Sequence, residues 1–222
     1  MSETERFEPQ APTKKWPTLE ELAEMANKID IPEKWQTDLK PLTPETLRDI
    51  CRRLADETPL SLEEWRKLRE VLYNKINYSK QPEVQRLWEL TIERGIDGLA
   101  HLIEVSTPEQ IRKSAEAHPS KDYKDPKFYW LAGTAKTWHD NIIRVLDISI
   151  GTTVQGIEKL AQKLMEQASI PFAKRAKELG ASGADAIEAT VDRLEYVRTY
   201  SSKQQKDETR IAQRVQEIMS TI

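Results

Sequence analysis

The sequence predicts an all-α protein: a multi-helix bundle with short N-terminal helices and long C-terminal helices, ending in a coiled-coil-like segment. Three observations predict this fold class. Only 7 of the 222 residues are glycine, and 32% are charged, which suits helices with long solvated faces. Few segments alternate apolar and polar residues as β-strands do, and apolar residues instead recur at helical spacing. Several segments also open with a recognisable helix start.

Three of these starts place a hydroxyl residue three positions before Glu or Gln: Thr18 to Glu21, Ser61 to Glu64 and Thr107 to Gln110. In such a capping box the hydroxyl accepts from an early backbone N–H, and the Glu or Gln side chain accepts from the N–H of the cap residue. A fourth start, Thr43-Pro44, puts proline at the first helical position, where its missing N–H costs nothing. With the apolar spacing, these signals predict helices near 18–29, 43–57, 61–77, 81–104, 107–117, 126–150, 152–179 and 182–220.

The helices predicted before residue 117 are amphipathic. In the segment 61–77 one stripe holds the larger apolar residues, Leu62, Trp65, Leu68, Leu72 and Ile76. Gly95 and Gly98, inside the next helix, either bend it or let a neighbouring segment approach closely. Cys51 is the single cysteine, so the chain has no internal disulfide and no CxxC motif, and its setting among helix formers predicts a small buried thiol.

The two long C-terminal segments each contain a feature that interrupts a regular helix. Pro171 predicts a kink or a division in 152–179. The stretch 201–210, SSKQQKDETR, has no large apolar residue, so the helix predicted over 182–220 is either solvated there on every side or broken. The final residues follow 4–3 spacing, which is typical of a coiled coil, at Ile211, Val215, Ile218 and Ile222.

We divide the chain into three parts. Residues 1–17 have the composition of a flexible N-terminal arm. Residues 18–117 form an N-terminal helical region, and residues 126–222 form a C-terminal long-helix region that is either separate or part of one domain with the preceding region. Trp16, at the end of the arm, either packs onto the first helix or anchors the arm to a partner.

Charge and hydropathy narrow the classes of function. The formal net charge of −3 disfavours a dedicated binder of duplex DNA. No apolar run approaches the ~18 residues of a membrane span, and the first residues lack the apolar stretch of a signal peptide. We therefore expect no membrane contact and a cytoplasmic location, or a place in a particle assembled inside the cell.

One pattern suggests metal chemistry. His139-Asp140 resembles the adjacent pair of metal-dependent HD phosphohydrolases, in which imidazoles and carboxylates hold a metal that activates water. Further ligands would be His101 or His118, with Asp185 or Asp192. Ordinary helix chemistry also explains the pair, because His139 borders the buried side of its helix and Asp140 lies four residues from both Lys136 and Arg144. His101 and His118 have similar ordinary explanations, at a core edge and a helix end. We expect no metal, no cofactor and no catalytic residue.

A second alternative is a nucleic-acid-binding helical module. Its basic residues lead into three aromatic ones: Arg112, Lys113, Lys121, Lys124, Lys127, Phe128, Tyr129 and Trp130. Three acidic residues, Glu116, Asp122 and Asp125, interleave with these cations and largely cancel their field. We therefore expect no nucleic-acid partner.

The function we expect is non-catalytic: a protein-protein interaction or assembly protein, such as an adaptor or a structural subunit of a phage or other particle. It would bind a protein partner or form a homo-oligomer through the C-terminal helix and the N-terminal arm. The residues expected to make these contacts are Trp16, Ile211, Val215, Ile218 and Ile222.

Overall fold

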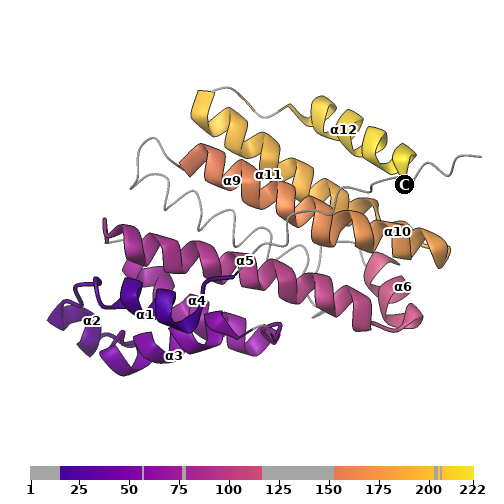
Figure 1. Cartoon of the computed structure of the whole chain (residues 1–222). Coiled ribbons are helices and arrows are strands. Elements are labelled where there is room, and N and C mark those ends of the chain that lie inside the picture. Colours follow the sequence, from indigo (N-terminus) through magenta and orange to yellow (C-terminus); the bar gives the residue numbers. More distant parts are fainter. Residues whose placement is uncertain (1–15, 57, 77–78, 117–152, 203–204, 206) are drawn as a thin grey trace, which may run out of the picture.

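The structure is a computed structural model that describes residues 16–56, 58–76, 79–116, 153–202, 205 and 207–222. Within these ranges the protein is a bundle of helices without strands, which confirms the all-α fold (Figure 1). The helix predicted over 126–150 lies outside the described residues.

The N-terminal elements are α1 (Leu19–Ala26), α2 (Glu33–Thr37), α3 (Pro44–Ala55), α4 (Leu62–Ile76), α5 (Pro82–Val105) and α6 (Pro108–Glu116). The C-terminal elements are α9 (Thr153–Leu164), the π-helical segment η2 (Met165–Ser169), α10 (Ile170–Glu178), α11 (Ala184–Ser202) and α12 (Glu208–Thr221).

All four predicted helix starts are confirmed. The Thr18 box is complete, with the Thr18 N–H donating to Glu21 at 2.8 Å and the Glu21 N–H donating to the Thr18 hydroxyl at 3.2 Å. The boxes at Ser61 and Thr107 make the same reciprocal bonds. At Thr43 the reciprocal partner is Thr46, and Pro44 occupies the first turn of α3.

Pro171 is accommodated by a change of helix type. The predicted helix over 152–179 divides into α9 and α10, and the π-helical η2 between them ends just before the proline. Proline has no N–H to donate and its ring clashes with the carbonyl one turn earlier. A widened π turn at this point, with Pro171 in the first turn of α10, fits both constraints.

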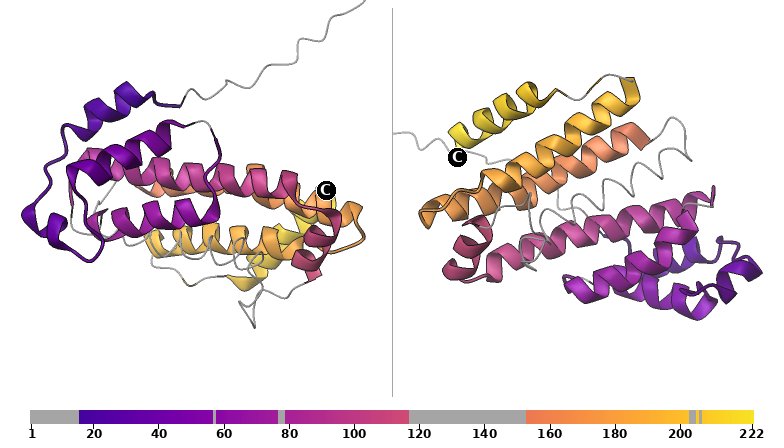
Figure 2. Two further views of the ribbon diagram at one scale, coloured as in Figure 1. Left: turned by 90° about the horizontal axis from the view of Figure 1, so that it is seen from below. Right: turned by 180° about the vertical axis from the view of Figure 1, so that it is seen from behind.

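The helix predicted over 182–220 is broken. Its first part, α11, ends at Ser202, and α12 begins at Glu208 after Asp207, whose side chain accepts from the N–H groups of Thr209 and Arg210 at 3.0 and 3.2 Å. Beyond the break, α12 folds back along α11, as Figures 1 and 2 show from three directions. The coiled-coil character of this end stays a prediction.

The long helix α5 lies between the N-terminal helices and the C-terminal ones (Figures 1 and 2). One apolar core continues from α1 across α5 to α9, α10 and the start of α11, and its members include Leu22, Leu72, Ile96, Leu99, Phe172 and Ala186. Of the two alternatives predicted for Gly98, the structure shows the close approach of a neighbouring segment, because a Cβ there would lie 2.8 Å from the backbone oxygen of Leu60.

Candidate interaction site

The C-terminal helix α12 packs on the outer side of α11 through an apolar stripe. Within this stripe, Ile211 is only 4% exposed and belongs to a small cluster with Met165, Ala173, Ile187 and Val191. The other apolar residues of the stripe are partly exposed and pack against the same cluster: Val215, Ile218, Met219 and Ile222. We call the five residues of α12, Ile211, Val215, Ile218, Met219 and Ile222, the α12 stripe.

An ion pair between an exposed arginine and a buried carboxylate adds a polar attachment. Arg210 donates from Nε to Oε2 of Glu195 at 3.1 Å and from Nη2 to Oε1 of the same carboxylate. The side chain of Glu195 is 5% exposed, so its charge is almost completely removed from water. The hydrogen bonds and charge of Glu195 raise the pKa of Arg210 above its ordinary value. A bidentate Arg–carboxylate pair is geometrically specific. Because the Arg210 side chain is itself 54% exposed, the costly change is removal of Arg210, which leaves the buried carboxylate of Glu195 unpaired.

The solvent side of α12 is polar. Gln213, Gln216 and Ser220 are exposed beside the small Ala212, and Arg214 pairs with Glu217 at 2.8 Å between Nη1 and Oε2. The helix therefore has one polar face, one buried anchor at Ile211, and an intermediate strip of half-covered apolar side chains.

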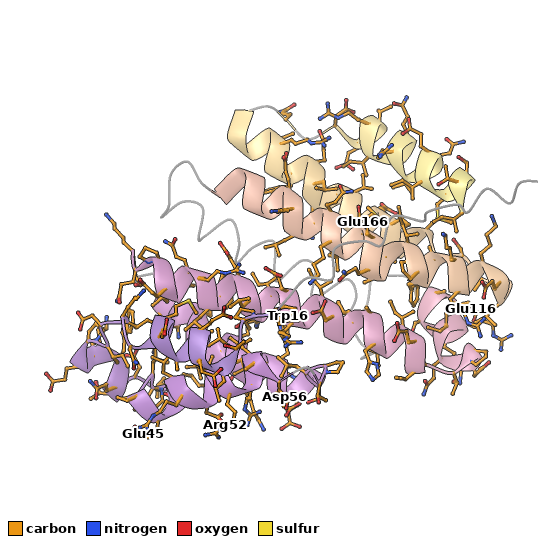
Figure 3. The ribbon with its side chains drawn as sticks, in the orientation of Figure 1. Trp16, Glu45, Arg52, Asp56, Glu116 and Glu166 are labelled. Atoms are coloured by element: carbon orange, nitrogen blue, oxygen red, sulfur yellow. The ribbon has the colours of Figure 1, made fainter. Side chains whose placement is uncertain are left out.

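Trp16 lies beside α5, where the N-terminal helices meet α9 (Figure 3). The guanidinium carbon of Arg94 is 3.9 Å from the centroid of its ring, and Nζ of Lys163 is 5.4 Å from it. The side chain of Trp16 also packs against the main core and is partly buried. Both cations over the ring thus come from α5 and α9, and a contact of Trp16 with a partner stays a prediction.

The charged groups under Trp16 form a network that the sequence did not reveal. Arg94 is 2% exposed and donates twice to the backbone oxygen of Leu54, at 3.2 and 3.0 Å, at the end of α3. Lys163 lies 2.9 Å from Asp97 and 3.9 Å from Glu93. These contacts join α3, α5 and α9. They therefore help to hold the N-terminal helices against the C-terminal ones.

Among the described residues, the ligands of the metal hypothesis do not form a cluster. His118 and the His139-Asp140 pair lie outside them, while Asp185 and Asp192 are on α11. The expectation that His101 borders the core is wrong: its side chain is 51% exposed, with Nδ1 3.8 Å from Glu104, because its position on α5 faces solvent. Within the described ranges, no three His, Cys, Asp or Glu side chains gather as a metal ion would require.

The basic residues proposed for nucleic acid are described only on α6. There Arg112 and Lys113 are exposed and both pair with Glu109, at 2.8 and 3.4 Å, and Arg112 also lies 3.9 Å from Glu116. Of the acidic residues predicted to offset these cations, only Glu116 is described; Glu109, which was not among them, pairs with both. The other members of the patch, Lys121, Lys124, Lys127, Phe128, Tyr129 and Trp130, lie outside the described residues.

Comparison of the chain with protein-family models, with curated proteins and with solved structures finds no match. In the part of the chain that the structure describes, none of the helices combines the length and hydropathy needed to cross a membrane. The fold defines the protein as an all-α helical bundle, and the candidate site is a terminal amphipathic helix.

Proposed function

We propose that this protein is a non-catalytic assembly protein that binds protein partners, foremost further copies of itself, through α12 with a contribution from the N-terminal arm. It would serve as an adaptor or structural subunit in the cytoplasm or in a particle assembled there. The observation that carries this proposal is the incomplete burial of the α12 stripe. Ile211 is buried, whereas the four apolar residues that follow it on the same side are half-covered.

The way α12 is attached supports this function. Among the described elements, the close packing of α12 is with α11, so α12 lies at the edge of the bundle. An element at the edge of a bundle opens more readily than the core does. Amphipathic helices recognise grooves through anchors at positions i, i+4 and i+7, which is the spacing of Ile211, Val215 and Ile218. The side chains that hold α12 in place thus also suit contact with another chain.

A test compares two substitutions on opposite sides of α12. Ile218→Glu places a charge in the half-covered strip, and Gln213→Glu places the same charge on the polar face. We expect the wild-type protein and Gln213→Glu to increase in mass with concentration in light-scattering measurements, and Ile218→Glu to stay monomeric. A wild-type protein that remains a monomer up to about 100 μM, well above the micromolar range of ordinary association, would contradict self-assembly.

A further inference from the structure

We propose that copies of this chain associate by exchanging α12, so that the α12 of one copy docks on the α11 of a second copy. This inference rests on the proposed function and specifies both the partner and the surface. The receiving surface consists of Ile187, Val191 and Glu195 on α11, with Met165 and Ala173 beside them.

Every contact that α12 needs is present on any folded copy. The apolar residues that share a core cluster with Ile211 come from η2, α10 and α11, all before the break in the chain. The carboxylate that binds Arg210 also comes from α11. An exchanged α12 would therefore reproduce the contacts of the monomer without requiring a new interface, which is why exchange of identical elements is a low-cost route to dimers.

The connection between the two helices permits the exchange. Residues 203–207 have the sequence KQQKD, which contains neither glycine nor proline. Lys and Gln are good helix formers, so no residue in the connection prevents one continuous helix from α11 to α12. The folded-back arrangement is favoured locally by the Asp207 cap, which accepts the N–H groups of Thr209 and Arg210. When that cap opens, α12 can extend away from its own α11 and present its stripe to another copy.

The charge pattern of α12 fits a second copy as the occupant. If α12 leaves, the buried Glu195 loses the two hydrogen bonds from Arg210, and the apolar side chains of Ile187 and Val191 lose their cover. A replacement must bring a guanidinium directly before a large apolar residue on a helix. The α12 of another copy has that pattern in Arg210-Ile211. A buried carboxylate without such a cation is strongly disfavoured.

Reciprocal charge reversal tests the exchange in full-length chains. Glu195→Arg places two cations together within its chain, and Arg210→Glu places two anions together within its chain. When the two variants are mixed, exchange sets the introduced arginine of E195R against the introduced glutamate of R210E at one site. At the second site it restores the native Glu195–Arg210 pair. We expect native mass spectrometry, with one variant ¹⁵N-labelled, to show heterodimers at more than about ten times the abundance of either homodimer, against the roughly twofold ratio of random mixing.

The doubly reversed chain E195R/R210E is the matched control. It has opposite charges within one chain and should associate with itself as the wild type does. Exchange predicts that it does not form mixed dimers with the wild type, because both exchanged pairs would join like charges. Free mixing of these two chains would overturn the exchange.

A second variant covers the case in which a reversed charge at the buried position 195 prevents folding. Deleting residues 204–206 shortens the connection so that α12 cannot return to its own α11. Exchange predicts an obligate dimer in which α12 retains its protection from hydrogen exchange. A monomer with an unprotected α12 would overturn the inference.

These outcomes separate the inference from the proposed function. Concentration-dependent multimers of the wild type, combined with statistical mixing of the reversed variants, would overturn exchange and leave self-assembly standing. A wild-type protein that is monomeric at every concentration would overturn both.

Discussion

At the scale of single residues, burial decides the chemistry of Cys51. The residue is 2% exposed, and its Sγ lies 3.6 Å from the backbone oxygen of Leu22, as expected for a small core thiol. Removal from water raises the pKa of this thiol to about 11. The thiolate is the reactive form of cysteine, so the folded protein should react slowly with alkylating reagents.

We predict that iodoacetamide labels Cys51 at least ~100-fold more slowly at pH 8 in the folded protein than in denaturant, because a thiol with a pKa near 11 is only about 0.1% ionised there. Mass spectrometry of timed samples would measure both rates. Equal rates would show that Cys51 is accessible in the folded protein. The raised pKa also means that this group stabilises the fold below its unfolded pKa, and that the contribution declines as pH rises toward 11.

Two nearby glycines, Gly180 and Gly183, are required for different structural reasons. Gly180 ends α10 with a φ of 75°, in the left-handed region that favours glycine, and a Cβ there would meet nothing within 4 Å. Gly183 instead lies where α11 passes close to α10, and a Cβ there would be 2.3 Å from Cα of Ala173. Because that neighbour is backbone, the two helices would have to move apart.

We predict that Gly180→Ala lowers the free energy of unfolding by about 1 kcal/mol, the cost of a left-handed conformation, and that Gly183→Ala lowers it by about 3 kcal/mol through steric overlap. Urea denaturation of the two variants measures both values under identical conditions. Similar losses would mean that the contact with Ala173 is easily relieved.

The buried charges are the residues that sequence reasoning could not identify. Lys75 is fully buried with Nζ 2.7 Å from Asp38, a partner 37 positions earlier in the chain. Glu195 is also buried, and its partner Arg210 lies 15 positions later. Each looks like an ordinary charge on an amphipathic helix, because its burial depends on which element packs over it. Sequence spacing reports the periodicity within a helix and not the identity of its neighbour.

At the scale of elements, a helix boundary could be predicted from the sequence where the residues that cause it lie close together in the chain. The helix starts at Thr18, Ser61 and Thr107 were predictable because all participants lie within four residues. The short α2 was not predicted: it has five residues, and its N-cap, Pro32, makes no side-chain cap hydrogen bond. The choice between a continuous helix and a break before α12 also required the structure, which shows the Asp207 cap.

The capping boxes provide a matched pair for studying pH dependence. Glu64 accepts hydrogen bonds from the hydroxyl and the N–H of Ser61, at 2.6 and 3.0 Å, and the hydrogen bond from the hydroxyl is the largest cause of its lowered pKa. In the Thr107 box the equivalent position is Gln110, which does not ionise in this range. The two boxes thus share the reciprocal backbone hydrogen bonds and differ in charge, and Glu64 also lies 3.4 Å from Nη1 of Arg53.

We predict that Glu64→Gln lowers the free energy of unfolding by about 0.5 kcal/mol at pH 7, because an anion in the first helical turn and its exposed ion pair with Arg53 are lost. A lowered folded pKa stabilises the protein above the unfolded pKa, near 4.5, and this contribution disappears as pH falls through the folded pKa. The difference from wild type should therefore shrink below pH 4. Gln110→Glu should show the opposite sign and the same pH range in parallel denaturation series. An effect of Glu64→Gln that is constant with pH would exclude the charge as its cause.

At the scale of the whole molecule, α5 connects the two helical regions predicted from the sequence. The main core contains residues of the N-terminal region, such as Leu54, and of the C-terminal region, such as Phe172, with Leu99 of α5 fully buried in the same cluster. The network of Trp16, Arg94 and Lys163 adds polar contacts across the same junction. This continuity predicts that the regions unfold together, whereas separate regions would unfold independently.

Leu99→Ala tests this cooperativity. Deletion of a fully buried leucine side chain should cost about 3 kcal/mol, since it combines lost burial with a cavity. If α5 belongs to one cooperative unit, hydrogen exchange followed by mass spectrometry should show similar losses of protection in α3 and in α10. Ile218→Ala on the peripheral α12 is the control, and should reduce protection in α12 while leaving α3 unchanged. Loss in α3 with α10 unaffected by Leu99→Ala would instead mean that residues 18–117 and the C-terminal helices are independent units joined at α5.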